Sequence, residues 1–133
     1  MDLFFGRIIV LVNDYDEAFE FYERALLCKK FFDLSENGER FLHIGFNSND
    51  KSGIRFLKAE TDEEKARVGN QTAGKPIFAL YTDNLNEFYN HLVEQNVIIT
   101  KEPAEKTDSI YLHFSDLYGN EIVLVEMKSE FST

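Results

Sequence analysis

The sequence is poor in residues that crosslink a chain or break its regular structure. Its 133 residues include one cysteine, two prolines, seven glycines and no tryptophan. The lone Cys28 excludes an internal disulfide and a multi-thiolate metal site, and its place after two leucines favours a buried structural thiol. So few glycines and prolines exclude a collagen-like or disordered chain. We expect a globular protein of a reducing compartment, the cytoplasm.

Long hydrophobic runs are also missing, and one sign of charge dominates. The first seven residues start acidic and have no long apolar run, so we expect neither a signal peptide nor a membrane span. Aspartate and glutamate number 24 against 14 lysines and arginines, which gives a net charge of −10. This charge repels phosphate backbones and anionic lipids, so nucleic acid and membranes are not expected partners.

The hydrophobic pattern predicts alternating strands and helices. Asp14, Thr61 and Asn84 each precede a glutamate by three residues, which is typical of a helix N-terminus. Asn37-Gly38 predicts a tight hairpin. The expected strands are 7–12, 31–34, 40–46, 53–58, 76–82, 97–100, 110–114 and 121–127, and the expected loops include 47–52 and 102–105.

The two halves of the chain repeat one pattern of a strand, a helix and three strands. An offset of 70 residues places Phe41-Leu42-His43 on Tyr111-Leu112-His113 and Glu17 on Glu87. We therefore predict an α+β fold of two tandem βαβββ modules within a single domain, 1–133. The first module is 1–60, a short helix and linker follow at 61–75, and the second module is 76–133.

Three segments carry a resemblance to a known family. They are Ile9–Asp14 with Ala18–Tyr22, then Phe78–Leu85, then the turn Asp116-Leu117-Tyr118-Gly119-Asn120. In this order they resemble the vicinal oxygen chelate superfamily of glyoxalases, bleomycin-resistance proteins and extradiol dioxygenases. The resemblance implies sheets that curl around a cup-like pocket, and it implies a homodimer.

The positions of the family's metal ligands hold unsuitable residues. The resemblance places these positions at Arg7, Ile77, Val123 and either Gly53 or Arg55. None of these side chains binds a divalent cation, so we expect no metal and no other cofactor. Glyoxalase and extradiol chemistry both need the metal and are therefore disfavoured.

The three histidines show no spacing typical of a zinc site. His43 and His113 are repeat equivalents that either face the pocket or satisfy separate local hydrogen bonds. Glu126 is the acid nearest the Val123 position, but in an ideal strand it lies on the opposite face. We assign no catalytic residue.

Strand alternation predicts the concave face. If Arg7 points inward, so do the alternate residues of its strand, and the pocket is apolar and aromatic with one or two guanidinium groups. Arg7 and Arg55 either hold an anionic ligand group or pair with nearby acids. The predicted ligand-binding residues are Arg7, Ile9, His43, Arg55, Ile77, Tyr81, Tyr111, His113 and Val123.

Three functions follow from this sequence. The first is a metal-free, non-catalytic protein that binds a small molecule, for example to sequester an antibiotic. The second is a metal-dependent lyase or isomerase resembling lactoylglutathione lyase, or an enzyme related to the dioxygenases. The third is a dimeric scaffold without a ligand.

Overall fold

The structure is a computed structural model that describes residues 1–46 and 51–129. The chain divides into two compact units, Met1–Val68 and Gly69–Thr133. The division falls inside the expected linker 61–75, and it groups the short helix at Asp62–Arg67 with the first unit. Most of the expected loop 47–52 lies outside the described residues.

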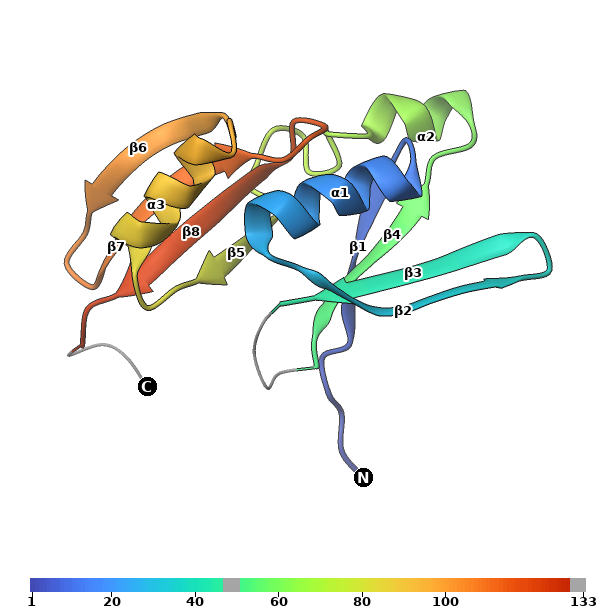
Figure 1. Cartoon of the computed structure of the whole chain (residues 1–133), viewed down its shortest axis with the longest axis horizontal. Coiled ribbons are helices and arrows are strands. Elements are labelled where there is room, and N and C mark those ends of the chain that lie inside the picture. Colours follow the sequence, from blue (N-terminus) through green and yellow to red (C-terminus); the bar gives the residue numbers. More distant parts are fainter. Residues whose placement is uncertain (47–50, 130–133) are drawn as a thin grey trace. The chain divides into compact units, whose positions relative to one another are not determined.

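As far as the structure describes it, the first unit is an open four-stranded sheet with two helices (Figure 1). Its strands follow the order β1-β4-β3-β2, in which β1 and β4 are parallel and the other pairs are antiparallel. The elements are β1 (Arg7–Val12), α1 (Tyr15–Leu26), β2 (Lys29–Glu36), β3 (Glu39–Gly45), β4 (Gly53–Lys58) and α2 (Asp62–Arg67).

The second unit repeats this topology, with one helix in its described residues. Its order is β5-β8-β7-β6, again with a parallel first pair and antiparallel neighbours. The elements are β5 (Phe78–Tyr81), α3 (Leu85–Glu94), β6 (Ile99–Glu105), β7 (Ser109–Ser115) and β8 (Glu121–Met127). The predicted α+β fold of two tandem βαβββ modules is therefore confirmed.

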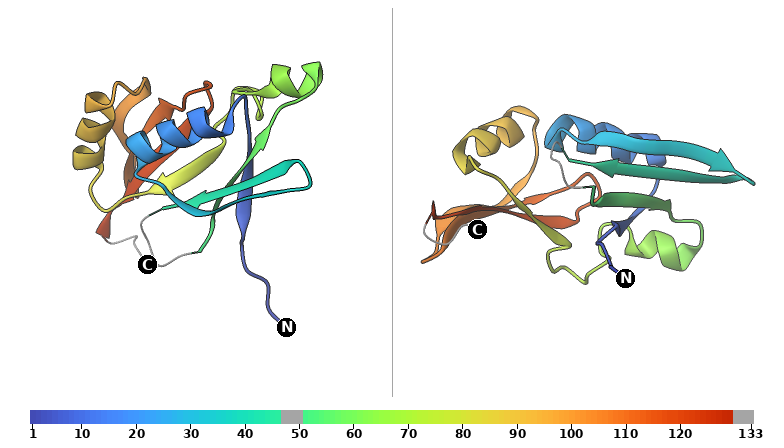
Figure 2. Two further views of the ribbon diagram at one scale, coloured as in Figure 1. Left: turned by 45° about the vertical axis from the view of Figure 1, so that its right-hand side comes forward. Right: turned by 90° about the horizontal axis from the view of Figure 1, so that it is seen from below.

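Each sheet buries one face against its long helix. In the first unit, alternate residues Val10 and Val12 are fully buried, and Tyr22 of α1 meets Phe56 edge-on at 5.2 Å. Figure 2 shows α1 running along one face of its sheet. Cys28 is buried as predicted, and burial raises the pKa of its thiol to about 12, so the thiol stays protonated at neutral pH. α2 buries no side chain. In the described part of the chain, we call the face of each sheet opposite its long helix the uncovered face.

The local signals in the sequence formed as predicted. The side chains of Asp14, Thr61 and Asn84 accept hydrogen bonds from backbone N–H groups three residues later, and each begins a helix. Asn37 and Gly38 both take positive φ, at 54° and 78°, as a two-residue hairpin turn requires.

The prediction for β6 was wrong. A loop was expected at 102–105, but β6 continues through Pro103 to Glu105. It is an edge strand, and its pairing with β7 shifts register between Lys101 and Ala104, so no ladder hydrogen bond is needed from the proline. The strand at 31–34 was also predicted too short, because β2 begins at Lys29.

The repeat offset changes within the sheets. Equivalent residues of the two units are 70 positions apart in β1 and β3. Ile9 pairs with Arg55, and its equivalent Ala79 pairs with Val123, so the offset is 68 residues for the last strand of each unit. The cause is loop length, since seven residues separate β3 from β4 and five separate β7 from β8. Structurally, Arg55 is therefore the equivalent of Val123.

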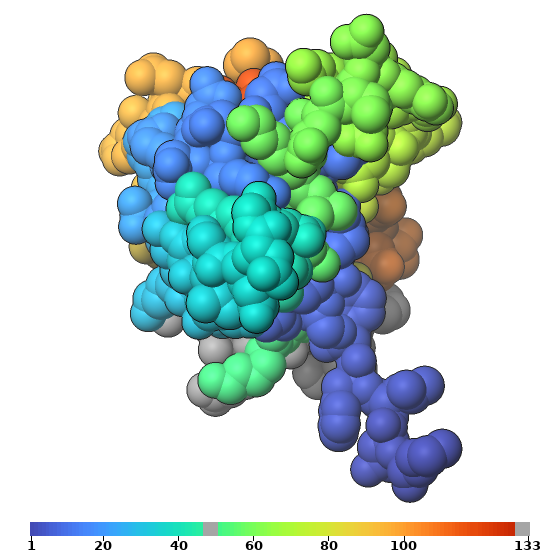
Figure 3. Space-filling view, turned by 90° about the vertical axis from the view of Figure 1, so that its right-hand side faces the viewer, coloured from blue at the N-terminus to red at the C-terminus, as the bar shows by residue number. Residues whose placement is uncertain are grey.

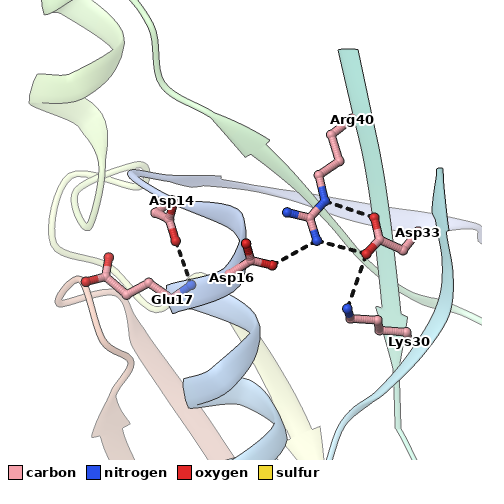
Figure 4. Close-up of polar contacts among 6 residues, drawn as sticks. All are labelled: Asp14, Asp16, Glu17, Lys30, Asp33 and Arg40. Atoms are coloured by element: carbon pink, nitrogen blue, oxygen red, sulfur yellow. Dashed lines mark hydrogen bonds and ion pairs between the residues drawn. The ribbon is translucent and has the colours of Figure 1, made fainter. Parts of the chain in front are cut away.

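An ion-pair network joins the start of α1 to the β2–β3 hairpin (Figure 4). Arg40 donates through Nε and Nη2 to both carboxylate oxygens of Asp33, at 2.9 and 2.8 Å, and through Nη2 to Asp16 at 2.9 Å. Lys30 adds a third contact to Asp33, at 3.2 Å. The hydrogen bond from Arg40 holds the pKa of Asp33 down to about 2, although partial burial opposes this shift.

The N-terminal residues extend away from the first sheet and carry exposed apolar side chains, Leu3, Phe4 and Phe5. Figure 3 shows this segment in blue, below the hairpin of β2 and β3 and the helix α2. Among the described residues, no helix has the length and hydrophobicity to cross a bilayer.

We predict that Asp33→Asn lowers the free energy of unfolding by about 1 kcal/mol at neutral pH, a modest value because the pair is partly exposed. Asp33 has a depressed pKa, so its stabilisation is present above pH 4 and is lost as the pH falls from about 4 to about 2. Urea unfolding at several pH values measures this. The two proteins should converge at the acid end, while Glu36→Gln on the same strand should behave like wild type throughout.

Candidate functional site

Four of the predicted ligand-binding residues lie on the uncovered face of the first sheet: Arg7, Ile9, His43 and Arg55. Register places Ile9 beside Arg55, Arg55 beside His43, and His43 beside Phe32. One row therefore crosses all four strands through Ile9, Arg55, His43 and Phe32, and we call it the central row. Two residues further along each strand lie Leu11, Leu57, Phe41 and Leu34, which form a second, apolar row on the same face.

The third row combines a cation with two glycines. Arg7 pairs with Gly53, which pairs with Gly45. The Phe31 ring fills the space above both glycines, because a Cβ atom at Gly45 would overlap that ring. The guanidinium of Arg7 then lies over the Phe31 ring at 4.9 Å, a cation–π contact.

Arg7 is also fixed by hydrogen bonds. Its Nη1 donates to the carbonyl oxygens of Gly6 at 2.9 Å and Lys51 at 2.8 Å. Its Nε donates to Nδ1 of His43 at 3.0 Å. An imidazole nitrogen that accepts a hydrogen bond carries no proton, so neutral His43 holds its proton on Nε2.

The environment of His43 favours this neutral form. Desolvation, and then the positive charges of Arg7 and Arg55, lower the pKa of His43 below its usual value of 6.5. Phe32 stacks on the imidazole at 4.2 Å between ring centroids. His43 Nε2 is shielded from solvent, and it has no hydrogen-bond partner within the described part of the chain.

Arg55 shows the same combination of fixed and unpaired donors. Its Nη2 donates to Glu39 at 3.3 Å, and its guanidinium lies over the Phe41 ring at 4.9 Å. Its Nε is shielded from solvent and finds no acceptor on residues 1–46 or 51–129. The central row therefore holds two neighbouring N–H donors without an acceptor among the described residues.

The uncovered face of the second sheet holds most of the remaining predicted residues. Ala79, Val123 and His113 form the row equivalent to the central row, and Tyr81, Val125 and Tyr111 form the next. Ile77 is instead buried at 9% exposure, so its side chain adds little open surface.

His113 differs from its repeat equivalent. Its Nδ1 lies 2.5 Å from a carboxylate oxygen of Glu121, so this nitrogen carries the proton and donates. His43 and His113 therefore each bond within their own unit but hold the opposite ring nitrogen protonated. Glu121 occupies the strand position that Gly53 has in the first unit.

Glu126 faces the helix side of its sheet, as alternation predicted. Its Oε1 accepts a hydrogen bond of 2.8 Å from the backbone N–H of Leu85 at the start of α3. Sequence reasoning missed Phe31, Phe32 and Phe41 as parts of the first face. Alternation from His43 would have identified Phe41, but the register shift between Lys30 and Phe32 concealed the place of Phe31.

The donor set does not fit a divalent metal. The register makes Arg55 the equivalent of Val123, so the positions implied by the family resemblance hold two arginines, an isoleucine and a valine. Within the described ranges, no three His, Cys, Asp or Glu side chains come together as a metal-binding group. Fixed cations at Arg7 and Arg55 repel a metal ion and attract an anion.

A family model for the Glyoxalase/Bleomycin resistance protein/Dioxygenase superfamily matches residues 5–124. The chain belongs to this superfamily. Superfamily membership agrees with the βαβββ topology of both units, and the metal-unsuitable donor set is a property of this member.

Similar proteins span nearly the whole chain. An uncharacterized protein of Shewanella frigidimarina is 28% identical over 116 residues, 86% of each sequence. The crystal structure of UcmS2 is 21% identical, with a TM-score of 0.83 over 94% of this chain and 98% of that one. TnmS3, an antibiotic binding protein from Streptomyces sp. CB03234, is 20% identical, with a TM-score of 0.79 over 96% and 98%. At these identities the two structures establish the shared fold.

We predict that Gly53→Ala destabilises the protein by about 1–3 kcal/mol, because the added Cβ meets the Ile44 carbonyl and crowds the Phe31 ring. Thermal or urea unfolding measures the change. Gly6→Ala is the matched control, since a Cβ there meets nothing within 4 Å, and its stability should stay within about 0.5 kcal/mol of wild type. Equal stability of the two variants would show that the glycine row is not tightly packed.

The lowered pKa of His43 predicts an acid-sensitive fold. Below pH 6.5 the unfolded chain takes up a proton at this histidine before the folded one does, so the free energy of unfolding falls with pH. His43→Gln removes this titration and should flatten the stability profile between pH 7 and the folded-state pKa. Urea unfolding across that range tests it, and parallel profiles for the two proteins would contradict it.

Proposed function

We propose that this protein binds a small organic molecule without a catalytic metal. The observation that carries the proposal is the central row, in which Arg55 stands where the resemblance implies a metal ligand and neighbours His43. Partly exposed apolar side chains of Ile9 and Phe32 flank the two polar groups. Apolar walls with a few placed polar groups are typical of a small-molecule site.

We propose the uncovered face of the second sheet as a further ligand-binding surface, described within its own unit. Tyr81 is 73% exposed and offers a surface on which a ring can stack. Val125 lies between Tyr81 and Tyr111, since it pairs with each of them on a neighbouring strand. His113, Val123 and the edge of Ile77 complete the predicted set.

Antibiotic sequestration is the biological role we propose for this binding. The support is the fold shared with TnmS3, an antibiotic binding protein, and a chain whose donor set suits binding better than metal-assisted turnover. We propose that the protein acts as a homodimer in the cytoplasm, where a single buried thiol is stable. Light scattering after size exclusion tests the dimer.

We predict that the protein, purified without a metal-affinity tag, contains less than about a tenth of an equivalent of any transition metal by elemental mass spectrometry, because its donor set repels cations. Adding zinc, nickel, manganese or iron should leave its melting temperature unchanged, as should a chelator. A thermal-shift screen of antibiotics should then find stabilising ligands that need no metal.

Near one equivalent of metal per chain would contradict this proposal and favour the lyase, isomerase or dioxygenase-related enzyme. A screen in which no antibiotic or other small organic molecule raises the melting temperature would favour the scaffold without a ligand.

A further inference from the structure

The strongest unexplained feature of the molecule is the pair of unsatisfied donors in the central row. Nε2–H of His43 and Nε–H of Arg55 come from residues directly opposite each other on neighbouring antiparallel strands, and both project from the same face. A buried N–H without an acceptor lowers stability, and nearly all such groups in folded proteins are satisfied. These two neighbouring groups are therefore candidates for an acceptor that the described residues do not provide.

The protonation state makes His43 a donor. Because Arg7 donates to Nδ1, the neutral imidazole must keep its proton on Nε2. Arg7 cannot easily turn to a ligand itself, since its other bonds are to two backbone carbonyls and its plane rests on Phe31. Arg7 is thus a positioning residue, and it acts through the tautomer of His43.

The charge around the pair favours an anionic acceptor. Arg7 and Arg55 supply two positive charges, and Glu39 offsets one of them at 3.3 Å from Arg55 Nη2. Aromatic and aliphatic side chains flank the donors: Phe32 is 44% exposed and Ile9 is 37% exposed. Because both lie on edge strands, they can move to admit a flat ligand without opening the core.

We propose that His43 Nε2–H and Arg55 Nε–H together bind one oxyanion of a planar aromatic acid, with its ring packed on the apolar side chains of the central row. This inference rests on the proposed function and names the ligand class of the same site. It replaces the expectation that Arg7 contacts the ligand, and it disfavours cationic ligands.

The test uses 2-naphthoate as the probe and 2-naphthylmethylammonium as its cationic counterpart with the same ring system. Calorimetry on the full chain should show saturable binding of 2-naphthoate and at least tenfold weaker binding of the cation. His43→Phe, which keeps the ring but removes both nitrogens, and Arg55→Met should each weaken 2-naphthoate binding by roughly tenfold or more. His91→Gln and Arg24→Met, on the helices, should bind as wild type does.

Nitrogen-15 spectra of the wild-type protein keep the proposal testable if a variant fails to fold. His43 should show a protonated Nε2 and an unprotonated Nδ1, and the probe should shift the signals of His43 Nε2 and Arg55 Nε. Arg7→Met should shift the tautomer equilibrium of His43 and, in the same variant, weaken the binding of 2-naphthoate. A purely structural role for Arg7 would leave the tautomer of the folded variant unchanged.

Several outcomes overturn the proposal. They are no saturable binding of 2-naphthoate up to about 10 mM, equal affinity in the His43 and Arg55 variants, or unmoved nitrogen signals at saturation. Binding of the cationic probe alone would refute the oxyanion site while leaving the proposed function intact. Stoichiometric metal uptake would instead refute the proposed function.

Discussion

The parallel pairing of β1 with β4 is the constraint on which the candidate site depends. It places Ile9 beside Arg55 and Arg7 beside Gly53, and the antiparallel partner β3 then brings His43 and Gly45 into the same two rows. Since side chains alternate between faces, a slip of one residue would turn both arginines toward α1 and put Val10 and Val12 in solvent. Burial of those valines therefore fixes the positions of the polar groups, and hydrophobic packing on one face specifies chemistry on the other.

The duplicated topology shows how two copies of one unit have come to differ. Gly53 leaves room for the Phe31 ring and hence for the platform under Arg7, whereas Glu121 at the equivalent position reaches His113. The same histidine position consequently donates through opposite nitrogens in the two units. In the first unit the shielded nitrogen of His43 keeps its proton and has no acceptor in the described part of the chain, and in the second unit the proton of His113 is held by the Glu121 carboxylate. The residue at this strand position is Gly53 in the first unit and Glu121 in the second. It therefore determines whether the neighbouring histidine, His43 or His113, has a carboxylate acceptor for its N–H.

The parts of this structure that depend on local rules were predictable from the sequence. Capping by Asp14, the Asn37-Gly38 turn and the burial of alternate residues all depend on neighbours a few positions away. Features that depend on long-range register were not predictable. Pro103 argued against a strand, but an edge position with a shifted register tolerates it. The contact of Arg7 with His43 joins residues 36 positions apart, and sequence alone suggested an acid or a ligand as the arginine's partner.

The replacement of metal ligands by arginine changes what this fold can do with a bound oxygen. A guanidinium supplies positive charge and directed N–H groups, so it can orient and hold an anionic oxygen as a metal can. It has no vacant coordination position, however, and it cannot polarise a carbonyl or acidify a bound water as a Lewis acid does. Glu39 pairs with Arg55 Nη2 at 3.3 Å, so the guanidinium is held by a carboxylate on the neighbouring strand. Arg55 and a neutral His43 therefore offer a bound oxygen directed N–H groups, where a metal would offer a coordination position.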